Sequence, residues 1–157
     1  MADDLKAGSP RVRRFEPRDA ERVREIAEQT AEAAQWSAES FQHLGSDAQF
    51  AWVVDSAVNG VIGFLVARTV AADEAEILNL AVAPANRRSG YATQLLQACL
   101  NELARRNIQN VYLEVRESNL TATGFYEKHK FVRTGRRPAY YQHPTEAAVL
   151  LVRKLTA

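Results

Sequence analysis

The sequence predicts a single α/β (α+β) domain with a mixed central sheet of about seven strands and about four flanking helices. Its length of 157 residues, with 46% hydrophobic and 25% charged residues, is ordinary for one globular domain. Apolar residues recur at helical spacing between 89 and 106, whereas the segments on either side alternate as strands do. A strand–helix–strand succession over 75–116 requires parallel neighbours, so the sheet cannot be purely antiparallel.

The first third of the chain is predicted to contain one strand and two helices. Residues 1–10 are polar and are expected to form a flexible N-terminal tail, which leaves 11–157 as the folded domain. The stretch 11–15 is typical of a short edge strand. Acidic residues followed by apolar residues at helical spacing predict a helix over 16–33. Ser37 is a suitable N-cap for a shorter helix over 36–44.

The middle of the chain is predicted to be β-structure. The runs 48–56 and 60–70 are joined through Asn59 and Gly60, a pair typical of tight hairpins. A third strand over 75–82 follows an acidic turn.

A helix is predicted over 89–106, and strands and a helix follow it. The apolar positions of this helix form one stripe: Ala92, Leu95, Leu96, Cys99 and Leu103. The remaining segments are a strand over 110–117, a short helix over 119–130, and a hairpin of 131–141 with 145–155. In such a sheet, the ligand crevice is expected at the carboxyl ends of the parallel strands.

Composition excludes several classes of function. A net charge of +1 argues against nucleic acid or an anionic membrane as the main ligand. The single cysteine, Cys99, rules out an internal disulfide and a cluster of thiolate ligands. No apolar run approaches the roughly 20 residues of a membrane span, and the first 15 residues lack the apolar core of a secretory signal. A cytoplasmic protein is expected. His43, His129 and His143 show no ligand spacing, so no metal is expected.

The stretch VAPANRRSGYATQLL, residues 82–96, has the chemistry of an anion site. It joins a strand to a helix, and the backbone amides from Arg88 to Thr93 have no partners within that helix. The helix dipole favours negative charge at the same place, and Gly90 allows close approach of a ligand. Arg87 or Arg88 could add charge-assisted hydrogen bonds to phosphate. Taken alone, the stretch is equally compatible with an ordinary turn and solvated arginines.

The pattern V-x-P-x-x-R-x-x-G-x-A in this stretch resembles the pyrophosphate loop of the GNAT family of N-acetyltransferases. The order of predicted elements is similar to that family's fold from about residue 11 to residue 154. The resemblance implies acetyl-CoA as the acetyl donor, with coenzyme A as product. It implies pantetheine contacts from the strand backbone at Leu80, Ala81 and Val82 and a further contact from Asn119. The loop residues implied are Arg87, Arg88, Ser89, Gly90, Tyr91, Ala92 and Thr93.

Other stretches resemble the ribosomal-protein-alanine N-acetyltransferase (RimI-like) branch of that family. These are WSAESF, ILNLAV, LEVRESN, FYEKHKF and GRRPAYY. The resemblance implies Glu114 as general base and Tyr126 as general acid in a direct attack within a ternary complex. It implies the α-amine of a protein N-terminus as acceptor, with an alanine of a small-subunit ribosomal protein as one candidate.

These residue types suit acetyl transfer to an amine. An α-amine has a pKa of about 7.7–8.0, so a nearby carboxylate can take its proton at neutral pH. A tyrosine hydroxyl can stabilise the departing thiolate. The same residues have structural alternatives: Glu114 could be a solvated strand residue, and Tyr126 a core aromatic. Cys99 lies on the apolar stripe of its helix, which favours a buried thiol over an acetyl carrier.

Two other functions remain open from the residues themselves. One is an acetyltransferase for small amines such as amino acids, polyamines or drugs, and the other is a non-catalytic acyl-CoA-binding module. The basic–aromatic group Arg136, Arg137, Tyr140 and Tyr141 fits a solvated turn, a nucleic-acid contact or a lip that grips the acceptor; we favour the lip. Trp36 is expected to be a packing anchor, and the resemblance implies that its region borders the acceptor groove. The protein is expected to be a monomer or homodimer.

Overall fold

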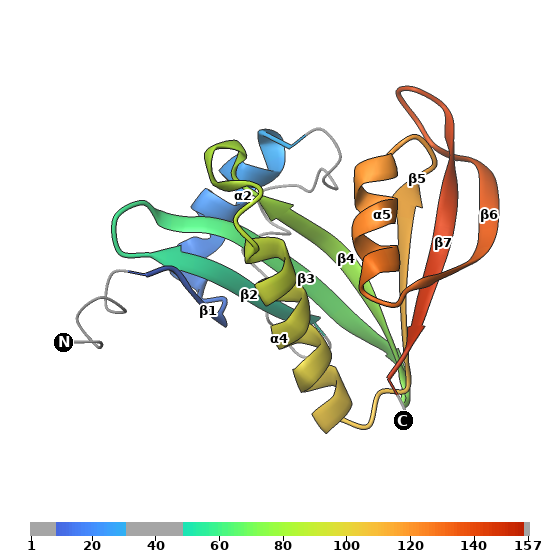
Figure 1. Ribbon diagram of the computed structural model, residues 1–157, viewed down its shortest axis with the longest axis horizontal. Helices are drawn as coiled ribbons and strands as arrows, with labels where there is room; N and C mark the ends of the chain where they lie inside the picture. The colour runs from blue at the N-terminus through green and yellow to red at the C-terminus, as the bar shows by residue number, and fades with distance from the viewer. Residues whose placement is uncertain (1–8, 31–48, 156–157) are drawn as a thin grey trace.

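The computed structural model describes residues 9–30 and 49–155 and places them around one seven-stranded sheet (Figure 1). The strand order is β1-β2-β3-β4-β5-β7-β6. The strands are β1 (Arg11–Arg14), β2 (Gln49–Ser56), β3 (Gly60–Ala71), β4 (Glu74–Val82), β5 (Asn110–Arg116), β6 (Val132–Tyr141) and β7 (Glu146–Lys154). All seven predicted strands are therefore confirmed, each within a few residues of its predicted bounds.

Three α-helices lie within the described ranges: α2 (Ala20–Glu28), α4 (Tyr91–Arg105) and α5 (Leu120–Lys128). Short 3-10 turns at Pro17–Asp19 and Pro84–Asn86 precede α2 and α4. The predicted first helix over 16–33 is wrong in extent, because Pro17 opens a 3-10 turn and the α-helix ends at Glu28. The predicted helix over 36–44, with Trp36 and His43, lies outside the described residues, as does most of the predicted tail.

The sheet is antiparallel except where β4 and β5 pair in parallel. That pairing covers only Glu74 with Asn110, Ala75 with Val111 and Glu76 with Tyr112. Beyond these pairs the two strands diverge, as Figure 1 shows above their shared lower end. The register of β4 against β3 also shifts at this point, leaving Leu78 as an extra residue. A bulge of this kind bends and twists its strand, which accounts for the divergence.

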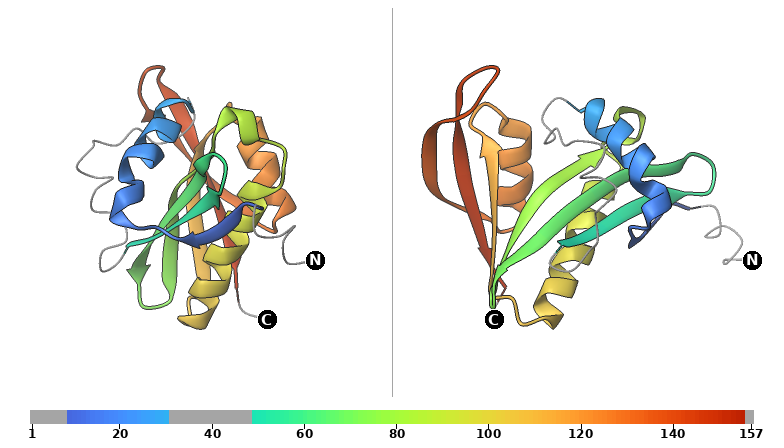
Figure 2. Two further views of the ribbon diagram at one scale, coloured as in Figure 1. Left: turned by 90° about the vertical axis from the view of Figure 1, so that its left-hand side faces the viewer. Right: turned by 180° about the vertical axis from the view of Figure 1, so that it is seen from behind.

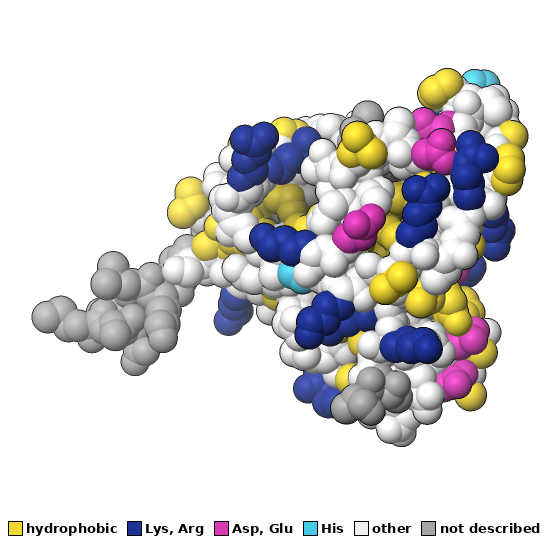
Figure 3. Space-filling model, turned by 45° about the vertical axis from the view of Figure 1, so that its right-hand side comes forward, with side chains coloured by type: hydrophobic (Ala, Val, Ile, Leu, Met, Phe, Trp, Pro, Cys, Tyr) yellow, Lys and Arg dark blue, Asp and Glu magenta, His cyan; other side chains and the backbone are white. Residues whose placement is uncertain are grey.

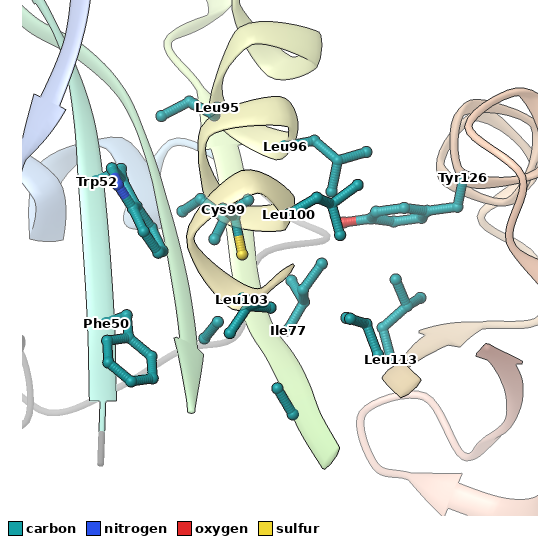
Figure 4. Close-up of a cluster of buried hydrophobic side chains, with 14 of the residues drawn as sticks. Phe50, Trp52, Ile77, Leu95, Leu96, Cys99, Leu100, Leu103, Leu113 and Tyr126 are labelled. Atoms are coloured by element: carbon teal, nitrogen blue, oxygen red, sulfur yellow. The ribbon is translucent and has the colours of Figure 1, made fainter. Parts of the chain in front are cut away.

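Helices cover both faces of the sheet, α2 on one and α4 with α5 on the other (Figure 2). The predicted stripe on α4 is confirmed in the core, where Leu95, Leu96, Cys99 and Leu103 are at most 1% exposed (Figure 4). On the opposite face, Val23 and Ile26 of α2 are fully buried. Each such side chain contributes about 1.5–3 kcal/mol by burial. Helices packed on both faces therefore hold the sheet together, although β4 and β5 are not paired at their carboxyl ends.

A buried ion pair fixes the start of α2 to the edge of the sheet. Asp19 is 4% exposed and accepts two hydrogen bonds from Arg13 of β1, at 2.8 and 2.9 Å, and one from the Glu16 amide at 2.8 Å. Burial by itself raises the pKa of Asp19, but the bonds from Arg13 and Glu16 outweigh it, so the pKa lies below its ordinary value.

Asp19→Asn should therefore lower the free energy of unfolding at pH 7 by about 1–3 kcal/mol. In the unfolded chain an aspartate carboxyl has a pKa of about 3.9, and in the folded protein the pKa of Asp19 is lower. The ionised carboxylate therefore stabilises the folded state fully when the pH is above about 3.9, and this contribution is lost as the pH falls through the folded-state pKa. Urea unfolding should accordingly show a gap between wild type and variant that narrows below about pH 4. Glu28→Gln, which breaks an exposed pair with Arg24, should cost only about 0.3–0.5 kcal/mol. An equal loss in the two variants would contradict the role of Asp19.

Candidate active site

The divergence of β4 and β5 opens a cleft of about 660 Å³ on the α4–α5 side of the sheet. It lies at the carboxyl end of the parallel pair, where the sequence places the ligand crevice. Eleven of the residues predicted to bind the donor or to act as acid line it: Leu80, Ala81, Val82, Arg87, Arg88, Gly90, Tyr91, Ala92, Thr93, Asn119 and Tyr126. Segments 80–93 and 119–126 are thus brought to one cavity.

One end of the cleft is formed by the loop before α4. Arg88 and Gly90 both have positive φ, 64° and 83°, so the chain turns sharply before the helix begins at Tyr91 rather than at the predicted Ser89. The first helical hydrogen bond runs from the Gln94 amide to the Gly90 carbonyl at 3.1 Å, and no side chain caps the helix. The amides of Tyr91, Ala92 and Thr93 precede that bond, so they can donate to an anion at the positive end of α4.

The two loop arginines have different surroundings. The Arg87 side chain donates to the Val82 carbonyl at 3.1 Å and to the Thr30 hydroxyl at 3.1 Å. The Thr30 hydroxyl donates in turn to the Ile26 carbonyl. Arg87 thereby joins the loop, the end of β4 and the end of α2, and two of its five N–H donors are used within the protein. Both arginines are exposed at the cleft, but these bonds hold Arg87 in place, which makes Arg88 the better placed of the two to meet a phosphate.

The wall of the cleft is one edge of β4. Leu80, Ala81 and Val82 pair on their other side with β3, opposite Leu65, Phe64 and Gly63. On the cleft side the ladder to β5 has already ended at Glu76. A strand edge with free backbone donors and acceptors pairs readily with an extended ligand that carries amides of its own. This geometry fits the pantetheine contacts that the sequence resemblance implies.

Asn119 begins α5 at the opposite wall. Its side chain accepts a hydrogen bond from the Ala122 amide at 3.0 Å, so it is the N-cap of the helix. It also lines the cleft beside Thr121 and Ala122. The amide nitrogen of the Asn119 side chain is left to donate toward a ligand.

Tyr126 projects from α5 toward Leu96 and Leu100 of α4 (Figure 4). It is 6% exposed and nevertheless lines the cleft. Burial, with a smaller effect from Cys99, raises its pKa above the ordinary value. The phenol therefore stays protonated at neutral pH and acts as a hydrogen-bond donor. Burial also raises the pKa of the Cys99 thiol to about 12, so Cys99 is the buried core thiol that its position in the sequence predicts.

Glu114 lies on the other face of the sheet from Tyr126. Side chains alternate along β5: Val111 and Leu113 pack with α4, whereas Tyr112 shares the face of its partner Glu76. Glu114 follows Tyr112 by two residues and thus faces the α2 side. It does not line the cleft.

Residues of the last hairpin surround Glu114. Arg137 forms an ion pair with it at 3.4 Å and is itself 56% exposed. The pKa of Tyr140 is raised, chiefly because its hydroxyl faces the Glu114 carboxylate. Burial and then Glu114 raise the pKa of Tyr141 to about 12. Three members of the predicted basic–aromatic group therefore gather at Glu114, whereas the fourth, Arg136, pairs with Glu117.

Several cleft residues were not predicted from the sequence. Thr121, Ala122 and Phe125 follow the Asn119 cap and could have been found by continuing the helix from it. The position of Thr30 at the cleft could not have been predicted in this way, because it depends on how α2 packs on the sheet. Ser89, although predicted, is exposed beside the cleft without lining it. His129 accepts or donates one hydrogen bond with Thr93 at 3.1 Å and lies against the Phe125 ring.

Charge on the visible face is dispersed. In Figure 3 the Lys and Arg side chains stand singly or in small groups, and several lie beside Asp or Glu. Across the described residues, no group of three or more His, Cys, Asp and Glu is arranged to hold a metal ion. Within the same ranges, no helix is both long enough and apolar enough to cross a membrane.

Comparison with known proteins places this geometry in a family. The model of the acetyltransferase (GNAT) family matches residues 12–131, which include the cleft, Glu114 and Tyr126. The chain belongs to this family. A curated relative, the ribosomal protein bS18-alanine N-acetyltransferase of Haemophilus ducreyi, is 41% identical over 86 residues, 55% of this chain and 59% of the relative. The match thus spans about three fifths of that relative's length.

Solved structures share the whole fold. The ribosomal-protein-S18-alanine N-acetyltransferase of Escherichia coli superimposes with a TM-score of 0.85 at 25% identity, covering 95% of this chain and 96% of that one. Arabidopsis thaliana NAA60, solved in complex with acetyl-CoA, superimposes with a TM-score of 0.84 at 21% identity and covers 93% of this chain and 98% of its own. At this identity, the likeness supports a shared fold and nothing further. The GNAT fold expected from the loop motif is therefore confirmed.

Gly90→Ala should weaken binding of coenzyme A about tenfold, because a non-glycine residue at φ 83° costs about 1–2 kcal/mol and shifts the amides that face the cleft. Calorimetric titration with coenzyme A gives the dissociation constant. Gly124→Ala is the matched control: Gly124 has open space around it within α5, so alanine should raise stability by up to about 1 kcal/mol. Equal affinity in the Gly90 variant and wild type would show that the loop does not bind the anion.

Proposed function

We propose that the protein transfers the acetyl group of acetyl-CoA to the α-amine of a protein N-terminus, with an N-terminal alanine of a ribosomal protein as the leading acceptor. One observation carries the proposal. The amides at the start of α4 and the edge of β4 border a single cleft where β4 and β5 diverge, and Glu114 lies on β5 two residues beyond the last β4–β5 pair.

The donor end of the cleft suits a long molecule with an anionic end and an amide-bearing arm. The amides of Tyr91, Ala92 and Thr93, with Arg88, take the pyrophosphate. The edge of β4 at Leu80–Val82 pairs with the arm, and Asn119 contacts it from α5. When bound, the donor supplies an activated thioester next to the opening between the strands.

The acceptor face suits an amine. Glu114 lies there among Arg137, Tyr140 and Tyr141 of the last hairpin, and the Arg137 and Tyr140 side chains are exposed among the described residues. A protonated amine is attracted to the carboxylate, and exposed Arg137 can move aside for it. The names of the Haemophilus relative and the Escherichia coli structure, both of them alanine N-acetyltransferases of one ribosomal protein, support a peptide N-terminus over a small amine.

The reaction needs one proton to be removed and one to be supplied. Glu114 takes a proton from the amine, directly or through water, as the nitrogen bonds to the acetyl carbon. The C–S bond then breaks as the Tyr126 hydroxyl, which its raised pKa keeps protonated until this step, gives its proton to the sulfur. Glu114 afterwards releases its proton to water and Tyr126 regains one from water, so both side chains return to their starting states. Cys99 takes no part, since its thiol is buried and protonated. The products are an N-acetyl amide and coenzyme A.

An acetylation screen tests the proposal. The acceptors are peptides that begin with alanine, including ribosomal-protein N-termini, the same peptides with a blocked α-amine, free amino acids and spermidine. Released coenzyme A gives the rate, and mass spectrometry locates the acetyl group. Free N-terminal peptides should have the highest kcat/KM. Preference for a small amine would overturn the acceptor assignment, and tight acetyl-CoA binding with no acetylation at all would point to a binding module.

Glu114→Gln should lower kcat on the preferred peptide about a hundredfold at pH 7, within the range for loss of a general base. The deficit should shrink as pH rises above the amine pKa of about 7.7–8.0, because the free amine then forms without help. A kcat profile from pH 6.5 to 9.5 measures this effect.

Tyr126→Phe serves as the comparison variant. It removes the donor to the sulfur, so its kcat should fall by a factor that does not recover at high pH, while affinity for acetyl-CoA stays within about twofold. If the Glu114 variant showed the same flat deficit, Glu114 would not be the base.

A further inference from the structure

The turn between β6 and β7 is tied to β5 by one side chain, Arg116. Its guanidinium donates to the Pro144 carbonyl at 3.1 Å and to the Gln142 carbonyl at 3.0 Å. It also lies over the Tyr141 ring, 4.6 Å from the centroid. The side chain is 26% exposed. Arg116 follows Glu114 by two residues on the same strand, so both side chains face the α2 side of the sheet.

The backbone ladder of the hairpin is interrupted near its end. The β6–β7 register shifts once between Arg133 and Gly135, and after Arg137 opposite Ala148 the next pair is Tyr141 opposite Glu146. The residues between Arg137 and Tyr141 therefore bulge out of the ladder, with Pro138 lacking an amide hydrogen and Ala139 at φ 53°. β6 is also the exposed edge of the sheet. An edge strand with an interrupted ladder needs an anchor outside the hairpin.

The anchored segment carries the two tyrosines that face Glu114. Tyr141 stacks edge-on with Tyr140, their ring centroids 5.1 Å apart, and Tyr140 in turn lies against Arg137. Holding Tyr141 therefore also limits where Tyr140 can go. A second contact reinforces the anchor, since Ser118 donates to Glu146 at 2.9 Å at the start of β7.

We propose that Arg116 is a positioning residue, which holds the β6–β7 turn and its Tyr140–Tyr141 pair against Glu114 so that the acceptor amine meets a preformed site. The inference rests on the proposed function, because it assigns the hairpin to the acceptor side. The Arg116 side chain does not line the cleft. Only its backbone carbonyl contacts a lining residue, by accepting a hydrogen bond from the Asn119 amide at 2.9 Å, and a side-chain substitution keeps that bond. The side chain is therefore expected to act on the acceptor and not on the donor. A planar guanidinium suits the task, since it reaches two carbonyls and a ring together, which an ammonium group cannot do.

The test compares Arg116→Gln, Arg116→Lys and the control Arg105→Gln in the full chain, with the acceptor that the screen identifies. Arg105 is an exposed residue at the end of α4. Arg116→Gln should raise the acceptor KM at least tenfold while the acetyl-CoA dissociation constant stays within twofold. Arg116→Lys keeps the charge but loses one of the two hydrogen bonds to backbone carbonyls and the stacking on Tyr141. Its acceptor KM should therefore lie between those of wild type and Arg116→Gln. Arg105→Gln should match wild type.

Hydrogen exchange gives a readout that does not depend on activity. In Arg116→Gln, backbone amides of 140–146 should exchange at least tenfold faster, whereas amides of α4 and β4 keep their wild-type rates. A general loss of folding would instead speed exchange everywhere. Unchanged exchange at 140–146 would overturn the proposal, even if wild type acetylated no peptide and the proposed function had failed.

A double-mutant cycle tests the route through Tyr141. Tyr141→Leu alone should raise the acceptor KM. The double variant with Arg116→Gln should have a KM within twofold of that of Tyr141→Leu, because Arg116 acts by holding the Tyr141 ring in position. Effects that multiply in the double variant would show that Arg116 acts elsewhere. A wild-type acceptor KM in Arg116→Gln, with active wild-type enzyme, would also overturn the inference while leaving the proposed function intact.

Discussion

The early end of the parallel ladder between β4 and β5 is the constraint on which the rest of the site depends. After three residue pairs the strands separate, at the point where Leu78 bulges out of register with β3. A continuous ladder would use the β4 edge for hydrogen bonds to β5 and would close the sheet between its two faces. The interruption instead leaves backbone donors and acceptors on β4 without β5 partners, and it opens a cleft on the α4–α5 side of the sheet.

An open sheet of this kind must be held by packing, because hydrogen bonds no longer join its two halves there. The α4 stripe packs across β2, β3 and β4, and Tyr126 and Phe131 fill the space between α4 and the β5–β7 half. Tyr126 therefore has two roles that support each other. Its ring is part of the core that sets the separation of the halves, and the same burial keeps its hydroxyl protonated as a donor beside the cleft.

The two sides of the candidate site are stabilised in different ways. The donor side consists of backbone groups on β4 and α4, fixed by the core and by Arg87, which joins the loop to Val82 and Thr30. The acceptor side consists of side chains on an edge hairpin whose ladder is interrupted, so it depends on contacts such as those of Arg116 with Gln142 and Pro144. Under the proposed function, the donor side and the acceptor side are held by separate contacts, so a substitution in the hairpin should leave donor binding unchanged.

The sequence by itself determined the order of elements, the loop at Arg87–Thr93 and the core position of Cys99. These follow from local rules: side-chain periodicity marks strands and helices, and a glycine before an amphipathic run marks a helix start with free amides. Only the tertiary structure decided that Arg87, although exposed, bonds to Thr30 and Val82, and that Glu114 lies on the opposite face of the sheet from the cleft, among Arg137 and Tyr140. Those outcomes depend on contacts between residues far apart in the chain and on where a ladder ends. No local pattern encodes either of them.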